Sequence, residues 1–267
     1  MLGEVLLLSL FIALTSGFTT SYAAFSRSEF LIVTVAHSAL AGLSVLYYIS
    51  YIFGFQVSSM HEWLMLVLLT TVVCLAVGRI REHGEKELIS AVIFALTLSI
   101  AALFMALLPG NLIARMWNFL TGSILLVTHL DLLIVSVISL VTCSLYTFFY
   151  REFLLISYDY EYALSTGIPA RLLNYILSML ISLITIVCVY TVGLFVTYSI
   201  LMIPGTLLSR ARLRTNSMIV LSSAIVLLSL LTSVLLSSYV PVPPSGLCGI
   251  IVCVLSLVPY LARIIRT

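Results

Sequence analysis

The chain has 267 residues, of which 62% are hydrophobic and only 8% are charged, and its mean hydropathy is +1.25. Soluble domains carry about 25% charged residues, so this composition excludes an aqueous globular fold and indicates a membrane protein. The net charge of +2 is too small to indicate nucleic-acid binding, and the 5 cysteines show no CxxC spacing that would indicate a metal or disulfide framework.

Runs of sequence without Asp, Glu, Lys or Arg predict the membrane-spanning helices, because one crossing takes about 20 apolar residues. The first five such runs each predict one helix, and they lie between residues 4 and 27, 29 and 62, 62 and 79, 87 and 115, and 131 and 151. The first run has no positively charged segment before it, so it predicts a retained helix rather than a signal peptide.

The last two runs, between residues 171 and 210 and between 214 and 263, are each long enough for two helices. Breaks are expected at Thr191-Val192-Gly193 and at the proline-rich stretch 240–246. The sum is about nine transmembrane helices in an all-α polytopic membrane protein, with residues 1–267 as a single domain. The run between residues 171 and 210 also fits one long helix followed by a re-entrant segment.

The positions of the cations predict the orientation of these helices. With nine helices and the N-terminus outside, all of the 12 Lys and Arg residues face the cytoplasm except Arg115, as the positive-inside rule favours. The C-terminus is then cytoplasmic. Arg115 belongs to a mixed stretch, 109–123, which predicts an interfacial or re-entrant segment at the outer face.

Residues 150–171, Tyr-Arg-Glu-Phe-Leu-Leu-Ile-Ser-Tyr-Asp-Tyr-Glu-Tyr-Ala-Leu-Ser-Thr-Gly-Ile-Pro-Ala-Arg, form the most polar segment between two apolar runs. The predicted topology places this segment in the cytoplasm between the fifth and sixth helices. Its apolar residues have a loosely helical spacing, which predicts a short amphipathic helix along the membrane face that ends before Pro169. Two interpretations stay open on the pattern alone: a docking surface for a soluble partner and an ordinary solvated loop.

Polar residues inside a membrane are costly, so each of them is a candidate site on the path of a transported ligand. His37 lies within the second predicted helix, where it either contacts a transported ion or is satisfied by a neighbouring hydroxyl such as Thr34 or Ser38. His129 and Asp131 lie at the outer end of the fifth helix, and imidazole with carboxylate suits zinc or manganese.

A second polar pair, His61 and Glu62, lies at the outer end of the third predicted helix. Together with His129 and Asp131, these residues could line an external vestibule. For His61 and Glu62 we favour the simpler interpretation, which is a pair of interfacial residues that cap a helix near water.

Four short motifs occur in a fixed order along the chain: Ala36-His37-Ser38-Ala39-Leu40-Ala41-Gly42, then Glu161-Tyr-Ala163-Leu-Ser-Thr-Gly167, then Gly193 to Pro204, then Pro243-Pro244-Ser245-Gly246. The second motif, a glutamate six residues before a glycine with an alanine between them, resembles the cytoplasmic loop signature of ABC importer permeases. The set resembles the integral membrane permease subunits of the zinc/manganese (divalent metal ion) ABC importer family over roughly residues 27–261.

This resemblance implies a type II ABC importer-like permease in the plasma membrane of a prokaryote. Such a permease is a homodimer that binds two cytoplasmic P-loop ATPase subunits and receives zinc or manganese from an extracytoplasmic metal-binding protein. Asp159, Glu161, Ala163 and Gly167 would then form the coupling contact with the ATPase. The chain has no GxxxxGK[ST] motif, so we expect no ATPase site, bound cofactor or enzymatic activity in the chain itself.

The resemblance also bears on the metal path. The family often has an aspartate four residues before the histidine of the first motif, on the same helix face. Here that position holds Val33, so the oxygen ligand is missing and His37 of each protomer is left as the expected transient contact.

Three alternatives remain at this point. A secondary transporter would also be all-helical, but the chain shows no internal repeat and has few acidic residues in its predicted spans. A structural membrane protein without transport is the second alternative. An ABC permease for iron, cobalt or a metal chelate is the third.

Overall fold

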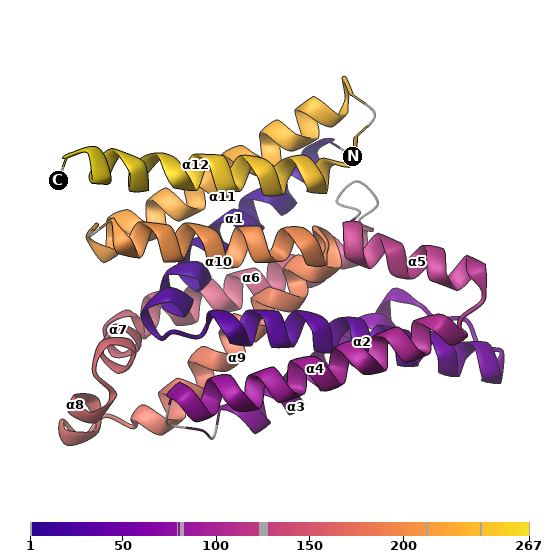
Figure 1. Ribbon diagram of the computed structural model, residues 1–267, viewed down its shortest axis with the longest axis horizontal. Coiled ribbons are helices and arrows are strands. Elements are labelled where there is room, and N and C mark those ends of the chain that lie inside the picture. The colour runs from indigo at the N-terminus through magenta and orange to yellow at the C-terminus, as the bar shows by residue number, and fades with distance from the viewer. Residues whose placement is uncertain are drawn as a thin grey trace.

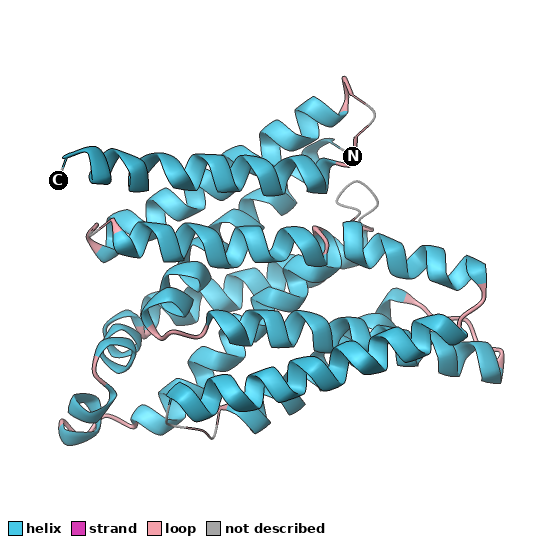
Figure 2. Ribbon diagram, viewed as in Figure 1, coloured by secondary structure: helices cyan, strands magenta, loops and turns pink. Residues whose placement is uncertain are grey.

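The computed structural model describes residues 2–78, 80, 83–122, 128–211, 213–240 and 242–266. Within these ranges the chain forms helices α1 to α12 and no strand (Figure 2). The all-α class predicted from the composition is therefore confirmed. The predicted cytoplasmic residues Arg79, Arg81 and Arg212 lie outside the described ranges.

Among the described residues, 8 helices are long and apolar enough to cross a membrane. They are α1 (Leu2–Phe25), α2 (Glu29–Phe53), α3 (Ser59–Val77), α4 (His83–Leu107), α6 (His129–Phe148), α9 (Ala170–Thr191), α11 (Thr215–Ser237) and α12 (Pro244–Arg266). Helix α10 (Leu194–Arg210) is apolar but has only 17 residues. These eight helices and α10 correspond one to one with the nine predicted spans.

Three further helices are shorter than a membrane crossing requires: α5 (Gly110–Thr121), α7 (Tyr150–Tyr158) and α8 (Tyr160–Ser165). Helix α5 occupies the stretch that was predicted to be an interfacial or re-entrant segment. Helices α7 and α8 occupy the polar segment 150–171, where the sequence predicts one helix and the structure has two.

The junction of α9 and α10 lies where the sequence predicts a break. Gly193 has φ +99°, which a residue with a side chain rarely adopts, and the helix resumes at Leu194. A Cβ atom on Gly122, at the end of α5, would lie 1.8 Å from the carbonyl oxygen of Val192. The two backbones therefore touch, and α5 is fixed against the α9–α10 junction.

Helices α1, α2 and α9 form the centre of the bundle. Helix α2 packs against α3, α4 and α9, and α1 packs against α6, α10 and α11. Helices α4 and α12 are the least buried of the long helices, so their apolar side chains face lipid or another subunit. Small residues allow α1 and α10 to approach closely, as is common between membrane helices. The Gly205 N–H donates to Thr20 Oγ1 at 2.8 Å, one residue after Pro204.

The connections between the helices lie at two opposite ends of the bundle (Figure 1). Helices α7 and α8, the α1–α2 and α10–α11 connections and the C-terminal end of α12 lie at the left end. The start of α1, helix α5, the α9–α10 junction and the α11–α12 connection lie at the opposite end. The segments that carry Arg27, Arg151 and Arg263 are all in the first group. These three cation-bearing segments therefore lie at one end of the bundle, as the charge pattern predicts.

Candidate functional site

Asp159 divides the polar segment into two helices. Its backbone is extended, with φ −147°, so it ends α7 and begins α8. Its Oδ1 atom accepts a hydrogen bond from the backbone N–H of Tyr162 at 2.9 Å. Aspartate is a favoured residue at this position because its side chain satisfies a backbone donor of the first turn. The prediction of a single helix in this segment is wrong, because Asp159 ends one helix and begins the next.

Gly167 closes α8 with a Schellman motif. The Ile168 N–H donates to the carbonyl of Ala163 at 3.3 Å, and the Gly167 N–H donates to that of Leu164 at 3.2 Å. Gly167 has φ +81°, which favours glycine. A Cβ atom at this residue would have no neighbour within 4 Å, so backbone conformation rather than space requires glycine here.

Helix α8 has one buried face and one exposed face. Ala163 is completely buried, whereas Glu161 and Tyr162 are exposed. The four residues of the predicted coupling contact, Asp159, Glu161, Ala163 and Gly167, therefore have separate structural roles. Asp159 and Gly167 fix the two ends of the helix, Ala163 packs it onto the bundle, and Glu161 is available to a partner.

Helix α7 connects this unit to the membrane helices through aromatic contacts. The ring of Phe153 packs edge-on against Tyr22 of α1 and Tyr146 of α6, at centroid distances of 5.8 and 6.1 Å. The Tyr150 hydroxyl donates to Asn216 Oδ1 of α11, and burial raises the pKa of this phenol. A displacement of α7 and α8 would consequently be transmitted to α1, α6 and α11.

His37 is half-buried in α2, and Tyr198 of α10 is its partner. Its Nδ1 atom lies 3.0 Å from the Val33 carbonyl oxygen and 2.7 Å from the Tyr198 hydroxyl. The Tyr198 ring is stacked on the imidazole at 5.8 Å, and Phe94 of α4 meets it edge-on at 4.6 Å. Among the described residues, the Nε2 atom has no hydrogen-bond partner, so His37 offers one free nitrogen ligand.

The predicted hydroxyl partners of His37 bind elsewhere. Thr34 Oγ1 donates to the carbonyls of Phe30 and Ser90, and Ser38 Oγ donates to that of Val35. The sequence could not identify Tyr198 as the partner, because this residue is separated from His37 by 161 positions and comes from a different helix.

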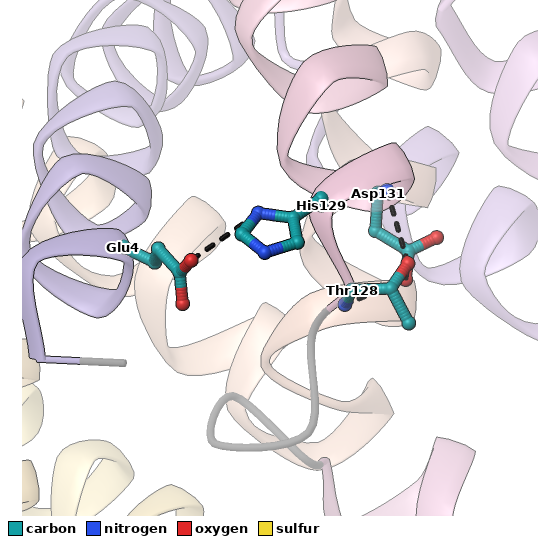
Figure 3. Close-up of polar contacts among 4 residues, drawn as sticks. All are labelled: Glu4, Thr128, His129 and Asp131. Atoms are coloured by element: carbon teal, nitrogen blue, oxygen red, sulfur yellow. Dashed lines mark hydrogen bonds and ion pairs between the residues drawn. The ribbon is translucent and has the colours of Figure 1, made fainter.

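His129 and Asp131 lie at the opposite end of the bundle from α8, and their side chains point in different directions (Figure 3). His129 is exposed, with its Nδ1 atom 3.2 Å from Glu4 Oε1 of α1. Asp131 is buried and forms a capping box at the start of α6. Its Oδ2 atom accepts from the backbone N–H and the hydroxyl of Thr128, at 3.0 and 2.6 Å.

The second oxygen of Asp131 is also occupied. Its Oδ1 atom accepts from the indole Nε1 of Trp63, on α3, at 3.0 Å. Because both oxygens are used inside the protein, the expectation that His129 and Asp131 form one ligand set does not agree with their geometry. The described part of the chain contains no group of three or more His, Cys, Asp and Glu side chains that could hold a metal ion.

The environment of Glu62 differs from the one predicted from the sequence. This residue is buried, and it accepts from two tyrosines: Tyr47 of α2 donates to Oε1, and Tyr190 of α9 donates to Oε2 at 2.9 Å. The interpretation of Glu62 as a helix cap near water is wrong, because aromatic partners from other helices enclose it. His61 does have the capping role, since its Nδ1 atom lies 2.7 Å from Ser58 Oγ in the capping box of α3.

The fold and these polar residues define a polytopic helical membrane protein. Comparison with known proteins identifies the family: residues 1–264 match the ABC 3 transport family, and the chain belongs to it. It is therefore a multi-pass protein of the prokaryotic cell membrane. The family resemblance inferred from the four motifs is confirmed.

Two bacterial relatives illustrate the range of similarity. The manganese transport system membrane protein MntC of Halalkalibacterium halodurans is 27% identical over 184 residues, which are 68% of this chain and 59% of that protein. The chain thus matches less than two thirds of this relative. A metal transport system membrane protein of Chlamydia muridarum is 22% identical over 211 residues, 79% of this chain and 71% of the relative.

Two solved structures share the fold. PsaBC from Streptococcus pneumoniae, in complex with Fab, aligns with a TM-score of 0.79 at 16% identity, over 97% of this chain and 90% of the other. An inward-facing structure described as a metal-chelate type ABC transporter aligns with a TM-score of 0.72 at 18% identity, over 95% and 85% of the two chains. At these identities the likeness concerns the fold.

Proposed function

We propose that this chain is the permease subunit of an ATP-driven importer for a divalent transition metal ion, zinc or manganese. The observation that carries the proposal is helix α8, a capped helical turn that buries Ala163 and exposes Glu161 at the end of the bundle where the cationic connections gather. Such an exposed, rigidly held helix suits docking into a cleft of a soluble partner. Two relatives are named manganese transport system membrane proteins, which favours manganese over zinc as the cargo.

The partners follow from this assignment. Two copies of the chain form a homodimer, each copy docks one cytoplasmic P-loop ATPase, and an extracytoplasmic metal-binding protein supplies the ion. The end that carries α8 then faces the cytoplasm and the N-terminus faces outside, in agreement with the positive-inside rule. ATP hydrolysis takes place on the separate subunits, and residues 1–267 form one permease domain within membrane lipid.

Transport in this proposal is alternating access by rigid-body motion. Closure of the ATPase pair moves α7 and α8, and the Phe153 contacts pass this movement to α1 and α6. The free Nε2 atom of His37 contacts the ion in transit, and exposed His129 contacts it at the outer end. A few weak ligands suit transport, because the ion must also leave.

One residue, Val33, supports a second candidate cargo, a metal chelate. Val33 stands one helical turn before His37, so no carboxylate joins the imidazole on that face. An uncharged path is more suitable for a metal chelate than for a bare divalent ion, because a chelator supplies its own oxygen ligands. The metal-chelate description of one structural neighbour agrees with this alternative.

Co-purification tests the ATPase coupling. We expect a P-loop ATPase to co-purify with the permease, and Gly167→Trp to abolish this complex because α8 would lose its C-terminal cap. Glu87→Ala, at an exposed carboxylate on α4, is the matched control and should retain the partner. An unchanged complex with Gly167→Trp would disprove the docking role. Uptake assays in proteoliposomes with labelled zinc, manganese and a metal chelate then identify the cargo.

A further inference from the structure

A cavity of about 300 Å³ lies beside the coupling unit, between the ends of several helices. Its lining comes from α7, α8, the start of α9, two residues that follow α3, the start of α4 and the α1–α2 connection. The volume is at the lower end of the range for small-molecule sites, about 300–1,000 Å³. The proposed function assigns no role to this cavity.

Two cations line the cavity in the part of the chain that the structure describes. Lys86 enters from α4 and Arg171 from α9, and none of the described residues that line the cavity is an aspartate or glutamate. The Lys86 Nζ atom donates to Ser28 Oγ at 2.9 Å, which fixes the ammonium group at the cavity wall. Within the part of the chain that the structure describes, the Arg171 guanidinium has no ion-pair partner. This charge would repel a divalent cation, so the cavity does not belong to the metal path.

The remaining polar residues carry groups that can donate hydrogen bonds. Tyr158, Tyr160, Tyr175 and Asn174 line the cavity. Ser157 also lines it, and its hydroxyl is buried without a hydrogen-bond partner among the described residues. A buried hydroxyl without a partner is costly, so a ligand atom that accepted a hydrogen bond from Ser157 would be stabilising.

We infer that this cavity binds a phosphate-bearing anion, supplied either by the headgroup of an anionic phospholipid of the adjacent leaflet or by free inorganic phosphate. The phosphate oxygens would be held by three residues on different helices: Lys86 on α4, Ser157 on α7 and Arg171 on α9. Arginine suits this role because its planar guanidinium gives two parallel hydrogen bonds to phosphate. The bound anion would fasten α7 to the membrane helices and thereby stiffen the connection to α8.

The binding part of this inference is independent of metal transport, so it can be tested on the full-length chain alone. The chain is reconstituted in phosphatidylcholine nanodiscs, and its thermal unfolding is measured in a titration with sodium phosphate against sodium chloride of equal ionic strength. A second arm replaces part of the phosphatidylcholine with phosphatidylglycerol and measures retained lipid by native mass spectrometry.

Three variants are compared with the parent chain in both arms: Arg171→Gln, Ser157→Ala and Arg210→Gln. The last is the matched control, since Arg210 is an exposed arginine at the same end and does not line the cavity. We expect Arg171→Gln to weaken binding about tenfold or more, because a hydrogen bond to a charged group is lost. Ser157→Ala should weaken binding without lowering the melting temperature of the unliganded chain, and Arg210→Gln should bind as the parent does.

Stabilisation by phosphate alone would identify a soluble anion, and a response to phosphatidylglycerol alone would identify the lipid headgroup. Either result supports the inference if Arg171→Gln and Ser157→Ala reduce it. Two results would overturn it: no stabilisation in either arm, or equal losses in Arg171→Gln and Arg210→Gln, which would indicate attraction to surface charge in general.

Discussion

The hydroxyl of Tyr198 lies 2.7 Å from Nδ1 of His37, and the two rings are stacked with an angle of 10° between their planes. This pair joins α10 to α2. Because Nδ1 is occupied and Nε2 is free, the tyrosine sets the direction in which His37 presents its one available ligand atom.

His37→Ala should therefore reduce metal uptake in proteoliposomes by about tenfold or more, since the residue is the proposed contact inside the membrane. Tyr198→Phe should have a smaller effect, about threefold, because the Val33 carbonyl still contacts Nδ1. Uptake of labelled ions with the ATPase subunits present measures the reduction in both variants. Full uptake by His37→Ala would show that the ion takes another route.

Asp131 has a structural role in this account, and its removal should lower stability rather than alter metal selectivity. Asp131→Ala leaves the Trp63 indole and the first turn of α6 without their acceptor, at a cost of about 1–3 kcal/mol. Thermal unfolding in detergent measures this loss. Trp63→Phe removes only the indole partner and should cost less. A changed order of zinc and manganese uptake in Asp131→Ala would instead support a ligand role.

The close approach of α1 and α10 depends on Gly205. A Cβ atom at this position would lie 2.1 Å from the carbonyl oxygen of Thr20, which is backbone and cannot rotate away. Gly205→Ala should therefore destabilise the protein by about 1–3 kcal/mol, as overpacking does. Gly246→Ala, in α12, is the matched control because a Cβ atom there meets nothing within 4 Å. Equal melting temperatures for the two variants would contradict this packing.

Backbone conformation gives a separate test at Gly167. Gly167→Asn should retain most of the ATPase complex, because asparagine tolerates a positive φ better than other residues do. Gly167→Val should lose it, since a β-branched residue is strained in this region by about 1–2 kcal/mol. Co-purified ATPase measures both. Equal recovery with valine and asparagine would show that the αL cap of α8 is not needed for docking.

The sequence predicts the membrane helices and their breaks because both depend on local features. Charge-free runs mark the spans, and Gly193 marks the junction of α9 and α10 through its own backbone angle. The unit around α8 is also local: its caps and the buried Ala163 lie within a few residues of one another. Such features can be recognised in a single chain without knowledge of how the helices pack.

The polar contacts between helices could not be predicted in this way. Glu62 is enclosed by Tyr47 and Tyr190, and the second of these is 128 positions away in sequence. Asp131 and Trp63 form a similar pair across 68 positions. Only the packing of α2, α3, α6 and α9 brings these partners together, so the sequence shows the polar residues but not what satisfies them.

In the proposed function, an ATPase that docks on the exposed face of α8 drives transport. The most direct test is ATP-dependent manganese uptake by proteoliposomes that contain the permease and its ATPase, with Glu161→Ala compared with the control Glu87→Ala. We predict uptake that requires ATP, a loss of about tenfold or more in Glu161→Ala because a charged contact is removed, and near-parent uptake in Glu87→Ala. Uptake without ATP, or equal rates in the two variants, would contradict the account.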